Sequence, residues 1–107
     1  MASRRKFDLV FAPETLDHLD AIERKHHGLI QRTTDGQLRS TPLKETRNRK
    51  PLSKSGPAGS TWELRFGPQN CFRVFYDVDE PAGEVHILAI GMKDRNRLFI
   101  GGQEYTP

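Results

Sequence analysis

Basic residues are concentrated in one stretch of this 107-residue chain. Between residues 39 and 54 there are six basic residues and one acidic residue, so the segment carries +5 while the whole chain carries +3. Everything else therefore sums to −2. Such a concentration of positive charge on one connection is typical of a surface that contacts phosphates, and the alternative is a solvated, mobile basic loop. The candidate nucleic-acid contacts in it are Arg47, Arg49, Lys50 and Lys54.

A second group of charged residues is interleaved with large apolar residues. Apolar and polar residues alternate from Trp62 to Phe66 and again from Cys71 to Val78, which predicts two strands joined by the hairpin sequence GPQN. Because side chains alternate across a strand, Glu63 and Arg65 lie on the side away from Trp62. Arg73 lies on the corresponding side of the next strand. We expect these charged residues to converge on one open surface.

Composition excludes several classes of protein. The only cysteine is Cys71, which excludes an internal disulfide framework and is typical of a reducing cytosol, so we expect a cytoplasmic protein. No apolar stretch has the length of a signal sequence or a membrane span. The histidines show no metal-ligand spacing, and we predict no metal site; they are His18, His26, His27 and His86.

The N-terminal half predicts one strand and a helical hairpin. Phe7, Leu9 and Phe11 alternate with polar or smaller residues, as in a strand with one buried face. Pro13 fits the first position of a helix that ends in the basic residues 24–26, with a buried stripe formed by Leu16, Leu19 and Ile22. Gly28 is the predicted cap of that helix, and Leu29, Ile30 and Leu38 predict a second helix packed beside it.

The C-terminal half predicts a long connection followed by a three-stranded meander. Residues 39–60 are rich in proline and glycine and show no periodicity, which indicates a long basic loop. The third run, Val85 to Ile90, is apolar on both faces, and residues 101–107 form a tail. We therefore predict a single α+β domain over residues 1–107: an N-terminal strand, an αα-hairpin, and a mainly antiparallel sheet with helices on one face and a polar opposite face.

Three segments resemble toxins of the RelE/ParE superfamily, the toxic halves of bacterial type II toxin–antitoxin pairs. They are ETRNRKPL (45–52), WELRFGPQNCFRVFYDVD (62–79) and HILAIGMKDRNRLFIGGQEY (86–105). The resemblance runs over nearly the whole chain and implies the same strand, helical hairpin and meander. It implies either a RelE-like ribonuclease, which needs no metal or other cofactor and cuts messenger RNA on the ribosome, or a ParE-like inhibitor of DNA gyrase that is not an enzyme. Either would bind a cognate antitoxin protein, and contact promoter DNA only through it.

The resemblance also implies catalytic positions for the ribonuclease. Arg73 matches the arginine that stabilises the phosphate, and Arg65 and Lys93 match two further basic positions. An arginine suits this task because its planar fork grips two phosphate oxygens at any relevant pH. The departures are Glu63, where relatives carry lysine, and Phe99, where they carry a tyrosine that exchanges a proton.

Several of these residues have two interpretations. Glu63 is either a general base or the partner of a cross-strand ion pair with the arginines. The aromatic residues Trp62, Phe72 and Tyr76 are predicted in the core rather than stacked on bases, and His86 is predicted to be a packing residue. Arg95 and Arg97 belong to a charged turn after the last strand, where they either contact RNA or remain solvated. Tyr105 would replace the missing tyrosine only if the tail folded back.

The sequence thus favours a ribosome-dependent endoribonuclease that arrests translation until its antitoxin neutralises it. The long basic loop agrees with RNA and ribosome contact. The lost tyrosine and lysine favour the alternatives, which are a gyrase inhibitor and a degenerate toxin that retains only antitoxin binding.

Overall fold

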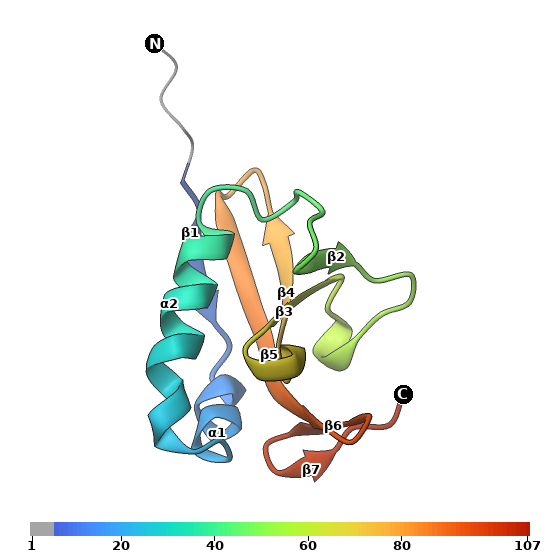
Figure 1. Cartoon of the computed structure of the whole chain (residues 1–107). Coiled ribbons are helices and arrows are strands. Elements are labelled where there is room, and N and C mark those ends of the chain that lie inside the picture. The colour runs from blue at the N-terminus through green and yellow to red at the C-terminus, as the bar shows by residue number, and fades with distance from the viewer. Residues whose placement is uncertain (1–5) are drawn as a thin grey trace.

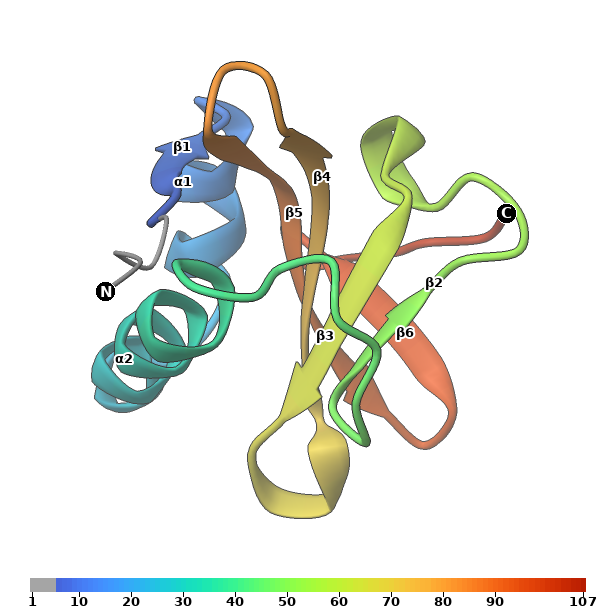
Figure 2. The same ribbon diagram turned by 90° about the horizontal axis from the view of Figure 1, so that it is seen from above.

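The computed structural model of the chain describes residues 6–107 and has two helices packed on one face of a mainly antiparallel sheet (Figure 1). This confirms the predicted α+β class. Figure 2 shows the helices on one side of the sheet and the connection around β2, together with the C-terminal tail, on the other. None of the helices in the described part of the chain is long and apolar enough to cross a bilayer.

The sheet is built around its longest strand, β5 (Glu84–Asp94). On one edge β5 pairs antiparallel with β4 (Phe72–Asp79), which pairs with β3 (Trp62–Phe66) and then β2 (Arg49–Pro51). On its other edge the first half of β5 pairs in parallel with β1 (Asp8–Phe11). The second half pairs with β6 (Arg97–Ile100), which continues into β7 (Gln103–Glu104). Two sequence-distant segments therefore lie end to end along one strand.

The hydrophobic core lies between the helices and the near face of the sheet. Phe72, Val74 and Tyr76 project from β4 into it, and Ile30 and Leu38 project from α2. Tyr76 is fully buried and its hydroxyl donates a hydrogen bond to the carbonyl of Pro42 at 2.7 Å. Trp62 stacks on the Tyr76 ring, and Phe72 is buried in the same core. The predicted core placement of the three aromatic residues is confirmed.

The first helix is shorter than predicted; Leu19 and Ile22 contact the core as predicted, but Thr15 takes the place of Leu16. Helix α1 spans Glu14–Asp20, a separate 3₁₀ turn spans Arg24–His26, and α2 spans His27–Leu38. Thr15 is buried in place of Leu16, because its hydroxyl donates to the carbonyl of Ala12 at 2.6 Å and so enters the core satisfied.

Four predictions about this region are wrong. Leu16 is 69% exposed rather than part of the buried stripe, and Phe11 is 45% exposed rather than part of the buried face of the first strand. Gly28 does not cap α1 but lies in the first turn of α2. The basic residues 24–26 follow the end of α1 instead of closing its last turn.

The connection between residues 39 and 60 is more ordered than predicted. It contains the edge strand β2 and a 3₁₀ turn at Pro57–Gly59. Pro57 and Ser60 are buried, and the ring of Phe75 is buried on this same far face of the sheet. The far face is therefore partly covered, not left open as predicted.

The turn after β5 also differs from the prediction. Lys93 lies within β5, and Arg95 and Asn96, both with positive φ, form a tight turn into β6. Residues 101–107 are not a simple tail, because Gly101 and Gly102 turn the chain back into β7. Gly91 permits this hairpin to pack closely, since a Cβ there would lie 2.9 Å from the carbonyl oxygen of Phe99.

Gly91→Ala is expected to destabilise the protein by about 1–3 kcal/mol, because backbone of β6 would have to move away from β5. The matched control is Gly36→Ala in α2, where an added Cβ meets nothing within 4 Å. That variant should gain up to about 1 kcal/mol through helix propensity. Urea denaturation of both variants measures the difference, and equal loss in both would contradict the proposed close packing.

Candidate active site

The two strand arginines and Glu63 form one ion-paired group on the far face of the sheet. Arg65 and Arg73 are directly opposite each other across β3 and β4. Glu63 bridges them: its Oε1 accepts a hydrogen bond from Arg65 Nε at 2.9 Å, and its Oε2 accepts one from Arg73 Nη1 at 3.1 Å. The Glu63 side chain is only 8% exposed. The predicted convergence is observed, and the ion-pair interpretation of Glu63 is confirmed.

Arg73 is held from two directions. Its Nε donates to the carbonyl of Asn70 at 2.9 Å, in the tight turn between β3 and β4, where Gln69 and Asn70 both have positive φ. With Nη1 on Glu63, the buried guanidinium is fixed, and its Nη2 has no partner among the described residues. Arg65 is more exposed and uses only its Nε. The pair therefore keeps several N–H donors for an anion.

A cleft of about 470 Å³ lies beside this group and contains Lys93. Lys93 comes from the same face of β5 as Gly91, the residue opposite Arg73. The connection before β3 and the end of the chain form the walls of the cleft. Its lining includes Leu52, Lys54, Gly56, Glu63, Arg73, Phe75, Lys93, Arg97, Leu98, Glu104 and Tyr105.

Tyr105 lines this cleft, a position that was not predicted from the sequence. The tail folds back after the Gly101–Gly102 turn, and the Tyr105 N–H donates to the carbonyl of Leu98 at 2.8 Å. This pairing brings Tyr105 into the lining of the cleft that also includes Arg73 and Lys93. The signal was present in the sequence, since Gly-Gly between RLFI and QEY is a hairpin pattern.

Phe99 lies on the other face of the sheet. It pairs with Met92 on β5 and lines a pocket with His18 and Ile22, next to the helices. Its neighbour Leu98 lines the cleft instead. A tyrosine at position 99 would thus not reach Arg73 in this fold, and the cleft has its phenol from position 105.

The remaining basic candidates divide into one buried residue and five exposed ones. The prediction that Arg49 contacts nucleic acid is wrong. Arg49 is 6% exposed, and its Nη1 donates to the carbonyls of Gln37 at 2.7 Å and Thr41 at 2.5 Å. It fastens β2 to the end of α2, so it is not available to RNA. Arg47, Lys50, Lys54, Arg95 and Arg97 are exposed. Lys50 is opposite Glu63 in the β2–β3 pair, and Lys54 and Arg97 line the cleft.

Burial shifts the pKa values of three ionisable groups near the core. Desolvation raises the pKa of the Cys71 thiol, so this residue stays protonated and is a poor nucleophile. Desolvation also raises the pKa of Tyr76, which has no role in proton exchange near neutrality. Desolvation lowers the pKa of His18, whose Nδ1 accepts a hydrogen bond from the Ile90 N–H at 3.2 Å. None of these three belongs to the cleft.

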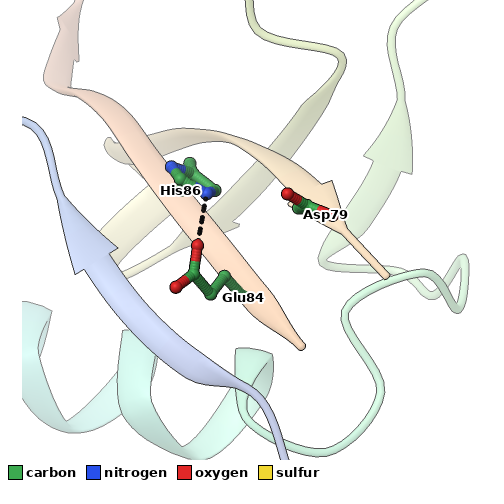
Figure 3. Close-up of side chains that lie close together, drawn as sticks. All are labelled: Asp79, Glu84 and His86. Carbon is green, nitrogen blue, oxygen red and sulfur yellow. Dashed lines mark hydrogen bonds and ion pairs between the residues drawn. The ribbon is translucent and has the colours of Figure 1, made fainter. Parts of the chain in front are cut away.

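One group of described residues has donors suited to a metal ion, and it lies at the other end of the sheet. Asp79, at the end of β4, and Glu84 and His86, on β5, place one ligand atom each within 4.8 Å of one another (Figure 3). His86 is half-buried and pairs with Glu84 at 3.1 Å, which satisfies the imidazole as predicted. Carboxylate and imidazole ligands are common for divalent cations. This group is separate from the cleft, whose lining does not include it.

Comparison with solved structures identifies the fold. The chain superposes on a chain of the toxin–antitoxin complex RelBE2 from Mycobacterium tuberculosis with a TM-score of 0.68, over 87% of this chain and 98% of that one. The two sequences are 20% identical over the match. No family model and no curated protein matches the sequence. The likeness is one of fold, and it extends over nearly all of both chains.

Arg49→Met should destabilise the protein by about 2 kcal/mol or more, because it removes the charge-assisted hydrogen bonds of a buried guanidinium to the carbonyls of Gln37 and Thr41. Lys50→Met is the matched control on the next residue of β2, and its exposed side chain should change stability by no more than about 0.5 kcal/mol. Guanidinium denaturation compares them. An Arg49→Met variant of normal stability but weakened RNA binding would return Arg49 to the binding surface.

Proposed function

We propose that this protein is the toxin of a type II toxin–antitoxin pair and a ribosome-dependent endoribonuclease that cuts messenger RNA. The observation that carries the proposal is the fixed Arg73 guanidinium, with Arg65 opposite it across the two strands, in the lining of a cleft that also includes Lys93 and Tyr105. The fold likeness to a chain of a toxin–antitoxin complex supports the pairing with an antitoxin. In this proposal the protein acts in the cytoplasm.

The reaction is a transfer of the phosphoryl group within RNA. The ribose 2′-oxygen attacks the adjacent phosphorus and loses its proton to solvent, while the bond from phosphorus to the 5′-oxygen breaks. The products are a 2′,3′-cyclic phosphate and a 5′-hydroxyl. Negative charge grows on the non-bridging oxygens as phosphorus becomes five-coordinate, and preorganised cations stabilise that charge. Arg73 and Lys93 are the groups for this task, with Arg65 beside them.

Tyr105 is the proposed general acid. A phenol carries a proton that it can give to the departing 5′-oxygen, and Tyr105 and Lys93 both belong to the lining of the cleft. Glu63 is not proposed as the base, because both of its carboxylate oxygens already accept hydrogen bonds from the arginines. The base is therefore water in this proposal.

Exposed basic residues around the cleft extend the surface for RNA. Lys50 and Lys54 lie on the β2 side, and Arg95 and Arg97 lie at the turn between β5 and β6. Arg47 precedes β2 and is also exposed. Contacts of this kind hold the phosphate backbone without reading sequence, so binding should weaken steeply with salt.

The proposed antitoxin contact is an apolar groove on the opposite side of the molecule. The groove has a volume of about 460 Å³ and lies between β1, α1 and α2, with the exposed Phe11 and Leu16 on its lining. Exposed apolar residues in a group are typical of a protein-binding surface. Its separation from the cleft means that the antitoxin would contact the helices as well as any part of the cleft that it blocks.

A second candidate function is inhibition of DNA gyrase without catalysis. The observation that favours it is Glu63, which neutralises part of the positive charge of the two arginines. Induction of the toxin in cells separates the two candidates. A ribonuclease leaves codon-phased transcript ends, whereas a gyrase inhibitor leaves relaxed plasmid and damaged DNA.

Arg73→Ala is expected to lower the rate of cutting by about 10²–10³-fold, the usual cost of a lost charge-stabilising donor. Arg24→Ala, in the exposed 3₁₀ turn between the helices, is the control and should cut normally. Transcript ends are mapped on programmed ribosomes, and antitoxin binding of both variants verifies that they are folded. Undiminished cutting by a folded Arg73→Ala protein would remove Arg73 from the site.

Tyr105→Phe should reduce cutting by about 10²-fold or more, because the phenylalanine ring fills the same space but has no proton to give. The matched variant is the double substitution Tyr105→Phe with Phe99→Tyr. We expect no recovery in it, since position 99 faces the helices. Single-turnover rates of cleavage measure both. Recovery in the double variant would show that position 99 supplies the acid and that Tyr105 does not.

A further inference from the structure

Glu63 is a buried carboxylate inside an otherwise basic group. Cross-strand pairs of like charge are unfavourable, and Arg65 and Arg73 are direct partners across β3 and β4. Glu63 lies between them and gives one carboxylate oxygen to each guanidinium. It is more deeply buried than either arginine, with 8% of its side chain exposed against 31% for Arg65 and 11% for Arg73.

The Glu63 carboxylate has the shape and charge of the anion that the two arginines would otherwise bind. A carboxylate and a phosphate both present oxygens that accept from the N–H groups of a guanidinium. Two N–H donors, Arg65 Nε and Arg73 Nη1, are now used by Glu63. With Glu63 in place the three side chains carry a net charge of +1, and without it they would carry +2.

We propose that Glu63 is an internal ligand of the anion site formed by Arg65 and Arg73, and that an incoming phosphate competes with it for these guanidiniums. Glu63 would thereby lower the affinity of the cleft for phosphates while it keeps the arginines in place. The proposal needs no enzymatic activity. It rests on the proposed function only for the statement that the natural competitor is an RNA phosphate.

Because Glu63 and Arg73 are buried, we expect an incoming phosphate to compete with the Glu63 carboxylate for the guanidiniums. A buried guanidinium without a counter-ion is strongly unfavourable, so Arg73 needs an anion at all times. Glu63 supplies it in the free protein. A phosphate that takes the Nε of Arg65 or the Nη1 of Arg73, and does not bind only the remaining donors, displaces at least one of the two hydrogen bonds of the carboxylate, and the cost of that step is subtracted from the affinity.

The chain offers a matched control for the charge of Glu63. Glu104 lines the same cleft, and its Oε2 lies 4.0 Å from Arg97 Nε with both side chains well exposed. Glu104→Gln therefore changes the net charge of the cleft as Glu63→Gln does, and leaves the two strand arginines untouched. A difference between the variants reports the direct contacts and not the overall charge.

The experiment titrates inorganic phosphate into the wild-type chain, Glu63→Gln and Glu104→Gln. Dissociation constants come from the NMR signals of the arginine Nε–H groups. Glu63→Gln should bind phosphate on the order of tenfold more tightly than wild type, the equivalent of one charge-assisted hydrogen bond regained. Glu104→Gln should stay within about twofold, because an exposed charge is well screened. A short single-stranded RNA is then titrated in the same way.

Three results would overturn the proposal. Equal tightening in both variants would mean that only net charge matters. Unchanged phosphate affinity in Glu63→Gln would mean that Glu63 does not compete. Weaker affinity would mean that Glu63 positions the arginines for the anion. Tighter phosphate binding without tighter RNA binding would uphold the competition and contradict the proposed function.

A second variant covers the case in which Glu63→Gln does not fold. Glu63→Asp keeps the charge but shortens the side chain by one methylene, so its carboxylate cannot hold both guanidiniums at the present distances. Glu63→Asp should bind phosphate more tightly than wild type, but by less than the roughly tenfold expected for Glu63→Gln. Equal affinity of Glu63→Asp and wild type would overturn the proposal on its own.

Discussion

Two guanidiniums facing each other across adjacent strands would repel, and the carboxylate between them is the contact on which the cleft depends. The β3–β4 register places Arg65 opposite Arg73, so the fold itself creates the repulsion. Glu63 relieves it with a hydrogen bond to each arginine. The carbonyl of Asn70 accepts a second hydrogen bond from Arg73 and so fixes the orientation of its guanidinium. Everything proposed for the site, from phosphate binding to competition, follows from this group being rigid and charged.

The two faces of the sheet are completed in different ways. The near face is closed by α1 and α2 over an apolar core, and it ends in an open groove where Phe11 and Leu16 are exposed. The far face is closed in part by the connection before β3 and by the end of the chain. Arg49 fastens that connection to the last turn of α2, so a buried cation ties the two layers together.

Alternation along the strands predicted most of the fold and the core of the site. The pattern from Trp62 to Val78 gave β3, β4 and the shared face of Glu63, Arg65 and Arg73. It could not place Arg49, because nothing in a proline-rich basic segment distinguishes a cation that satisfies two carbonyls from one that meets solvent. The apolar spacing of the first helix misplaced Leu16, since the core accepted Thr15 with its hydroxyl bonded to Ala12. Tyr105 was missed because the turn at Gly101–Gly102 was not interpreted as a hairpin.

One edge of β5 is shared by two strands: β1 pairs with its first half and β6 with its second half. β1 is paired with residues 84–87 and β6 with residues 91–94, so neither pairing depends directly on the other. We therefore expect the pairing of the β6–β7 hairpin with β5 to open without disrupting the pairing of β1 with β5. Such a partial opening would remove one wall of the cleft without global unfolding, and amide exchange in the two halves of β5 would then proceed with different free energies.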